Sequence, residues 1–112
     1  MDERARRIAE NEILFREVNE RVQELDARFT SPSTFEIVCE CGEDTCFERI
    51  EIERGEYEAV RAAGVLFAVV PGHEAEDVER VVEQQDSYKV VEKLPEGARL
   101  AEATDPRSQP ER

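Results

Sequence analysis

The three cysteines of the chain are grouped in the spacing Cys39-x-Cys41-x4-Cys46. Thiolates are soft ligands that zinc prefers, and a structural zinc site has four protein ligands arranged in a tetrahedron. The only histidine, His73, follows an apolar run in a Pro-Gly turn and is the remaining donor of the usual kind. The sequence therefore predicts a Cys3His site for Zn²⁺, with metal ligands Cys39, Cys41, Cys46 and His73. Because protein atoms fill all four positions, the predicted metal is structural and not catalytic.

The cysteines lie at the tip of a predicted β-hairpin over residues 35–52. Apolar and charged residues alternate on both arms, and the register that pairs the apolar residues sets Cys41 opposite Cys46. Cys39 then joins the same face, opposite Glu48, which is the runner-up for the fourth ligand or a partner that orients one. The apolar pairs of this register are Phe35 with Ile52 and Ile37 with Ile50. A slip by one residue would expose these pairs and bury charge.

Two other interpretations of the thiols stay open. Small buried cysteines are common core residues, so Cys39 could simply continue the apolar face. Alternatively, Cys41 and Cys46 could form a reversible disulfide in a thiol redox protein or redox sensor. The neighbouring acidic residues Glu40 and Glu43 would raise the thiol pKa values and weaken this second option. No catalytic motif accompanies the cysteines: the chain lacks a Gly-rich phosphate loop, an HExxH motif and a supported Ser-His-Asp arrangement. An enzyme is therefore not the favoured interpretation.

A long helix is predicted over residues 2–29, which lack Gly and Pro and place apolar residues at intervals of three and four. This stripe can be written as a heptad seam, with Ile8, Phe15, Val22 and Phe29 at one position and Asn11, Val18 and Leu25 at the other. A seam of this kind could join two chains as a parallel homodimer. Ile13 and Leu14 lie beside the seam and widen the stripe, which favours packing within one chain.

The rest of the chain predicts a small antiparallel sheet. Residues 55–64 suit a short helix, and residues 65–70 suit a buried strand. Residues 78–94 suit a helix or a second hairpin around a loop at 85–87. Cross-strand pairing of opposite charges and of valines (Val82 with Val90, Val81 with Val91, Glu83 with Lys89) favours the hairpin. Residues 95–112 are polar, hold two prolines and show no period, so a disordered acidic and polar tail is expected.

The predicted fold class is therefore α+β. A long N-terminal helix precedes a small antiparallel sheet of two β-hairpins plus one strand, with one short helix. Residues 1–94 form a single domain, made of the helix at 2–29 and the sheet region with its zinc hairpin at 35–94. Residues 95–112 lie outside it.

The acidic charge excludes several classes of partner. Fifteen basic and 28 acidic residues give a net charge of −13 at pH 7. Nucleic-acid binding, which depends on clustered Lys and Arg, is not expected, and neither is binding to an anionic membrane. No signal peptide is recognisable and the number of cysteines is odd, which predicts a cytoplasmic protein with reduced thiols. The sequence thus favours a small zinc-binding module for protein–protein interaction, whose protein partner is unknown.

Several segments together resemble a group of short uncharacterised actinobacterial proteins. These segments are NEILFREVNER, FEIVCECGEDTCFERIEI, EYEAVR, FAVVPGH and YKVVEK. The resemblance covers about the first 93 residues and includes all three cysteines and His73. It implies a recurrent bacterial cytosolic domain, and it implies no activity because none is assigned to that group.

Overall fold

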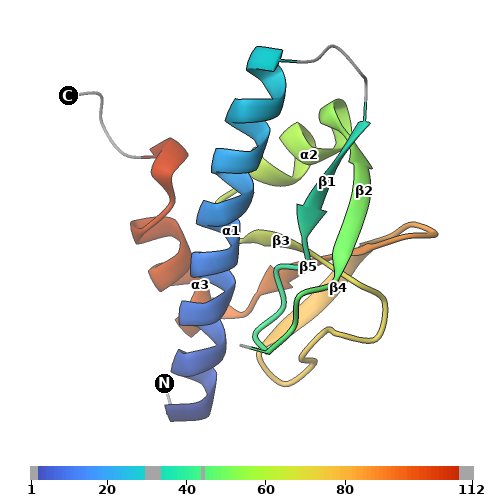
Figure 1. The fold of residues 1–112 in the computed structure, drawn as a ribbon. Helices are drawn as coiled ribbons and strands as arrows, with labels where there is room; N and C mark the ends of the chain where they lie inside the picture. Colours follow the sequence, from blue (N-terminus) through green and yellow to red (C-terminus); the bar gives the residue numbers. More distant parts are fainter. Residues whose placement is uncertain (1–2, 30–33, 44, 109–112) are drawn as a thin grey trace.

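The computed structural model describes residues 3–29, 34–43 and 45–108 and confirms the α+β class. Helix α1 (Glu3–Phe29) precedes β1 (Thr34–Val38) and β2 (Arg49–Glu53), which pair as a two-stranded antiparallel sheet. After α2 (Arg54–Arg61), a second antiparallel sheet is built from β3 (Leu66–Val69), β4 (Glu79–Gln84) and β5 (Lys89–Lys93), in the order β3-β5-β4. Helix α3 (Pro95–Ala103) and the 3-10 turn η1 (Pro106–Ser108) follow. Figure 1 shows α1 running beside the strands, with α3 packed along it.

The predicted register of the first hairpin is confirmed. Phe35 pairs with Ile52 and Ile37 pairs with Ile50, and all four side chains are buried. A further backbone hydrogen bond, from the Cys39 N–H to the Glu48 carbonyl (2.9 Å), places those two residues opposite each other. Alternation with period two thus brings the apolar arms into the core and positions the cysteines at their end.

The strands divide between two sheets, whereas the sequence predicted one. The segment after β1 approaches the free edge of β3, where the Glu40 N–H donates to the Ala68 carbonyl (2.9 Å). The backbone N–H groups on this edge of β3 donate to side chains of the same segment. The Ala68 N–H donates to Glu40 Oε1 (3.0 Å), and the Val70 N–H donates to Cys39 Sγ (3.1 Å). A carboxylate and a thiol thus take the place of backbone carbonyls and join the two sheets.

The second hairpin forms, but part of its predicted register is wrong. Val81 pairs with Val91 as expected, whereas Glu83 pairs with Val90 and Gln84 with Lys89. The Gln85 N–H donates to the Tyr88 carbonyl (2.8 Å), so the connection is one residue tighter than the predicted loop. Two-residue turns match strand twist best, and a β-bulge at Val82 absorbs the extra residue.

The expected disordered tail is wrong for residues 95–108, because α3 and η1 occupy them. Pro95 suits the first turn of a helix, where its missing N–H costs nothing. The helix is fixed by distant contacts that have no local signal. Ala101 is buried in the core, and the Asp105 carboxylate forms an ion pair with the buried Arg61. Residues 109–112 lie outside the described residues.

Helix α1 packs on its own chain through a face that differs from the heptad seam. Its buried residues are Ala9, Glu12, Arg16 and Asn19. The seam residues Ile8, Phe15 and Val22 are half-buried, and Val18 is exposed. The side chains of residues 25–29 lie outside the described part. Packing within one chain is what the helix shows, and the homodimer through residues 2–29 stays a prediction.

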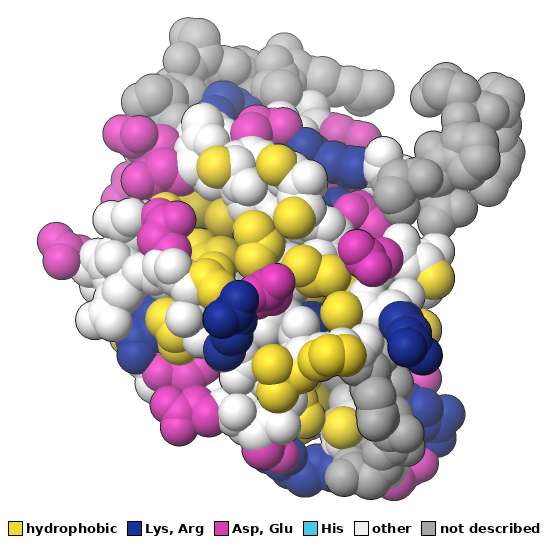
Figure 2. All heavy atoms as spheres, turned by 180° about the vertical axis from the view of Figure 1, so that it is seen from behind, with side chains coloured by type: hydrophobic (Ala, Val, Ile, Leu, Met, Phe, Trp, Pro, Cys, Tyr) yellow, Lys and Arg dark blue, Asp and Glu magenta, His cyan; other side chains and the backbone are white. Residues whose placement is uncertain are grey.

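The molecular surface carries mixed charge. On the face shown in Figure 2, basic side chains are scattered among acidic ones, and hydrophobic side chains gather near the middle. No helix among the described residues is both long and apolar enough to cross a membrane.

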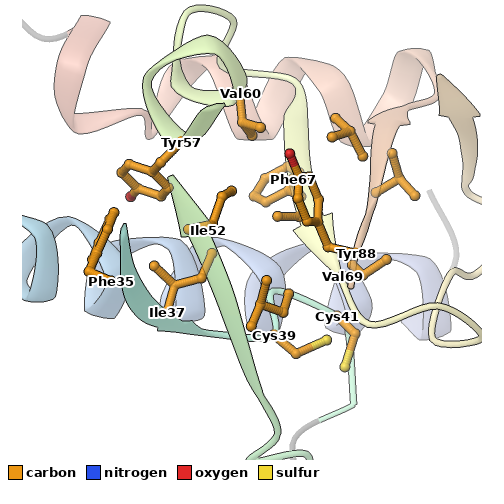
Figure 3. Close-up of a cluster of buried hydrophobic side chains, with 14 of the residues drawn as sticks. Phe35, Ile37, Cys39, Cys41, Ile52, Tyr57, Val60, Phe67, Val69 and Tyr88 are labelled. Atoms are coloured by element: carbon orange, nitrogen blue, oxygen red, sulfur yellow. The ribbon is translucent and has the colours of Figure 1, made fainter. Parts of the chain in front are cut away.

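The hydrophobic core runs between the two sheets and the helices. Figure 3 shows Phe35 and Tyr57 at one end of this cluster, with their rings 5.5 Å apart in an edge-to-face arrangement. Cys39 and Cys41 lie at the other end. The core therefore ends at the thiol cluster.

Candidate metal centre

All four predicted ligands lie together. The ligand atoms of Cys39, Cys41, Cys46 and His73 are within 4.8 Å of one another. His73 Nδ1 is 3.6 Å from Cys39 Sγ and 3.6 Å from Cys46 Sγ. Ligands bound to zinc at about 2.0–2.3 Å in a tetrahedron lie roughly 3.3–3.8 Å apart. The four donors are thus close enough to hold a metal ion.

His73 reaches the thiols because β3 ends in a tight turn. The His73 N–H donates to the Val70 carbonyl (2.9 Å), which closes a turn with Pro71 and Gly72 at its centre. Gly72 has a φ of +96°, a conformation that residues with a Cβ rarely adopt. The Pro-Gly pair of the sequence therefore sets the direction of the imidazole.

Backbone N–H groups stabilise the thiolate form of each cysteine. Each sulfur accepts a hydrogen bond from the residue two positions later, which lowers the thiol pKa. These pairs are Cys39 with Cys41, Cys41 with Glu43, and Cys46 with Glu48. The Val70 N–H adds a second hydrogen bond to Cys39 Sγ. A hairpin tip that folds its N–H groups onto sulfur is suited to holding thiolates.

The three thiols do not ionise independently. A hydrogen bond from Cys39 is the main cause that lowers the pKa of Cys41 to about 5. The same hydrogen bond and burial raise the pKa of Cys39, and burial is the main cause that raises the pKa of Cys46. One thiolate thus suppresses the ionisation of its neighbours, and a bound cation would be needed to hold all three as thiolates.

Glu48 is placed to orient the histidine. Its Oε2 lies 3.2 Å from His73 Nε2, on the side of the ring away from the sulfurs. A carboxylate at this position holds a proton on Nε2 and leaves Nδ1 free as a ligand. Of the two roles that the sequence offered for Glu48, the geometry fits the partner of a ligand.

Sequence reasoning missed Glu40, which lies between two of the ligands and is fully buried. Its carboxylate accepts hydrogen bonds from the Asn19 side chain (2.7 Å) and from the Ala68 N–H (3.0 Å). Burial raises the pKa of this carboxyl group. In a sequence with 28 acidic residues, a single glutamate gives no local signal that it belongs to the interior.

A cavity of about 490 Å³ lies beside the centre, between the start of α1 and the loop that carries the cysteines. It is lined by Arg4, Arg7, Ile8, Asn11, Gly42, Glu43, His73 and Ala75. Within the described residues, Arg4 pairs with Asp77 at the rim. His73 therefore borders both the thiol cluster and this cavity.

Comparison with known proteins finds no family model that matches the chain, and no curated protein or solved structure that is similar to it. The resemblance to short actinobacterial proteins is not tested by these findings and stays a prediction.

Proposed function

We propose that this protein is a small zinc-stabilised module of the bacterial cytoplasm that binds a protein partner and performs no catalysis. Zinc held by the four ligands is structural in this proposal. The observation that carries it is the convergence of three sulfurs and one imidazole nitrogen within 4.8 Å. Zinc is favoured over other metals because three thiolates and one imidazole are a ligand set typical of structural zinc.

The chemistry around the ligands supports the same proposal. Glu48 holds the imidazole, and backbone N–H groups point at the sulfurs. Cys39 and Cys41 are each 1 % exposed, whereas Cys46 and His73 are half-buried, so metal bound there would be shielded on the side of the first two ligands. A site whose four ligands all come from the protein stabilises a fold and leaves no position for a substrate.

Metal analysis of the full chain, purified without a histidine tag, tests the proposal. We expect about one zinc per chain, and cobalt(II) substitution should give the absorption bands of a tetrahedral thiolate site. Cys46→Ser should lose most of the metal. Thr45→Ser, at an exposed neighbouring position, is the matched control and should keep it. Wild-type protein that is fully folded without bound metal would contradict the proposal.

A thiol redox function is the second candidate, favoured by the lowered pKa of Cys41 and by the partial exposure of Cys46. A peroxide would be reduced to water as two thiols lose two electrons and two protons to form the Cys41–Cys46 disulfide. Mass spectrometry after mild peroxide treatment, with and without zinc loading, separates the two functions. A reversible disulfide in the zinc-loaded protein would favour the redox function.

A further inference from the structure

The segment that carries the first two cysteines faces two ways. Cys39 and Cys41 belong to the thiol cluster, whereas the residues that alternate with them contact α1. These contacting residues are Val38, Glu40 and Gly42. Val38 and Gly42 make these contacts through their backbone carbonyls, and Glu40 makes its contact through the side chain. Because each of these residues is bonded directly to a cysteine, fixing the cysteines also restrains the backbone on which α1 rests.

Residues 3–11, at the start of α1, contact this segment through Gly42. The Asn11 side chain donates to the Gly42 carbonyl (3.0 Å). A Cβ at Gly42 would lie 2.3 Å from Ile8 Cγ2, so the backbone of the loop touches the helix directly. Ala9 is buried beside this contact, and an ion pair joins Arg4 to Asp77, whose side chains are more than half exposed. Exposed pairs of this kind contribute little.

The middle of α1 is anchored differently. Arg16 is buried and donates to the carbonyls of Gly64 (2.7 Å) and Ala101 (2.9 Å). Glu12 is buried against Lys93, with 2.7 Å between Glu12 Oε1 and Lys93 Nζ. These contacts reach α3 and β5 and do not involve the cysteine segment.

The middle of α1 also contacts the cysteine segment, through Asn19 and its hydrogen bonds with Val38 and Glu40. Arg16 and Glu12, however, hold it independently of that segment. Residues 3–11 have Gly42 as their contact with the segment.

The contact between Gly42 and residues 3–11 of α1 is bordered by open space. The cavity of about 490 Å³ lies along it and is bordered by Ile8, Asn11 and His73. Because a cavity lies on one side of this contact and only a few polar contacts lie on the other, we expect the helix to separate from the loop when Gly42 moves.

We propose that metal occupancy controls the docking of residues 3–11 of α1, through the ligand Cys41 and its neighbour Gly42. With metal bound, Cys41 is fixed and holds Gly42 under Ile8 and Asn11. When the metal leaves, Gly42 is released, residues 3–11 undock, and Ile8 and Ala9 become accessible. This inference rests on the proposed metal site and adds a conformational output to it.

Hydrogen exchange of the full chain, zinc-loaded and after removal of zinc by a chelator, tests the proposal. We expect amide exchange in residues 3–11 to increase roughly tenfold or more on metal removal, while residues 13–23 change much less. Unchanged exchange in residues 3–11 would overturn the proposal. An equal increase throughout α1 and both sheets would also overturn it, because the metal would then stabilise the whole fold and not specifically the contact between Gly42 and residues 3–11.

Thermodynamic linkage gives a second test, which is independent of hydrogen exchange. If metal binding docks the helix, then weakening the dock must weaken metal binding by the same factor. Asn11→Ala removes the contact to Gly42 without touching a ligand and should lower zinc affinity by roughly fivefold. Glu10→Ala, at an exposed position on the same helix, is the matched control and should bind zinc as wild type does.

These outcomes separate the two proposals. If the wild-type protein binds no zinc, both the metal site and the proposed effect of metal on the docking of α1 are wrong. Wild-type protein that binds one zinc per chain, together with equal zinc affinities for Asn11→Ala and Glu10→Ala, contradicts only the control of α1.

Discussion

At the scale of single residues, the ligand set could be predicted because the chain holds few candidates. Three cysteines and one histidine are the only thiol or imidazole donors, and a β-hairpin with a unique apolar register places the cysteines at one end. Glu40 and Asn19 could not be predicted. Their partners are a carbonyl, an amide and a carboxylate that lie some twenty or more residues away, and such contacts leave no periodic pattern.

The contact between Glu48 and His73 leads us to expect that replacing Glu48 lowers the affinity for zinc. Glu48→Gln keeps the size of the side chain but removes the charge that holds the imidazole, so zinc should bind about 10–100-fold more weakly. Competition with a chelating dye measures this. Glu51→Gln alters an exposed carboxylate on the same hairpin and serves as control. Equal affinities for the two variants would mean that Glu48 does not orient the ligand.

Gly42 predicts a steric effect at the same loop. Gly42→Ala would bring a methyl group into Ile8, and overpacking of this kind costs about 1–3 kcal/mol. Gly55→Ala is the matched control, because a Cβ there meets nothing within 4 Å and alanine favours the helix α2. Urea unfolding of the zinc-loaded proteins should show a loss for the first variant and none for the second. A Gly42→Ala protein as stable as wild type would show that the loop does not press on α1.

At the scale of elements, local periodicity predicted α1, the hairpins and β3. It did not predict the features that depend on distant contacts, such as the buried face of α1 and the helix α3. The bulge at Val82 follows from a tighter turn, and sequence pairing alone favoured the unbulged register. The fully buried face of α1 is mostly polar and lies beside the apolar stripe, whose members Ile13 and Val22 are only partly buried against the core. On that face Glu12 contacts Lys93 of β5, which Glu79 of β4 also contacts, with 2.7 Å and 3.3 Å between the carboxyl oxygens and Lys93 Nζ.

This buried group predicts a pH dependence of the attachment of α1. Burial, and then the neighbouring Glu79, raises the pKa of Glu12 well above its ordinary value. The folded state therefore keeps a proton that the unfolded state releases. The stabilisation is fully present below the ordinary glutamate pKa and is lost as pH rises through the raised pKa of the folded state.

Glu12→Gln cannot ionise, so its free energy of unfolding should fall less than that of wild type as pH rises from about 5 to 9. Urea unfolding at several pH values, with zinc bound throughout, measures the difference between the two proteins. Glu10→Gln changes an exposed carboxylate on the same helix and should follow the wild-type curve. Parallel curves for Glu12→Gln and wild type would mean that Glu12 is ionised in the folded protein across this range.

At the scale of the whole molecule, the interior of this acidic chain is held by charged side chains as well as by apolar ones. Within the described residues, the buried polar set is Glu12, Arg16, Asn19, Glu40, Arg61, Glu79, Lys93 and Asp105. Each of these makes a hydrogen bond or an ion pair with an element distant in the sequence. Buried pairs add little net stability compared with apolar packing, but losing one partner is costly, so they make the elements depend on one another.

From that dependence we expect residues 95–108 to be needed for a stable fold, although the sequence predicted a disordered tail over residues 95–112. Removing residues 95–112 deletes the Ala101 carbonyl that accepts from Arg16 and the Asp105 carboxylate that pairs with Arg61. Arg16 then loses a hydrogen bond, and Arg61 loses its partner in a buried ion pair. Breaking a buried ion pair in this way costs about 3–5 kcal/mol. A domain of this size has a stability of only about 5–15 kcal/mol. The truncated chain should therefore lose its cooperative thermal transition in circular dichroism.

A milder variant separates this effect from a general sensitivity of the C-terminal region. Arg107→Ala removes ion pairs with Glu20 and Glu58 that are partly exposed, and such pairs contribute at most about 1 kcal/mol. Its transition should stay cooperative and shift only slightly. If the chain of residues 1–94 unfolds at the wild-type temperature, Arg16 and Arg61 must find other partners, and the domain would end where the sequence first placed its boundary.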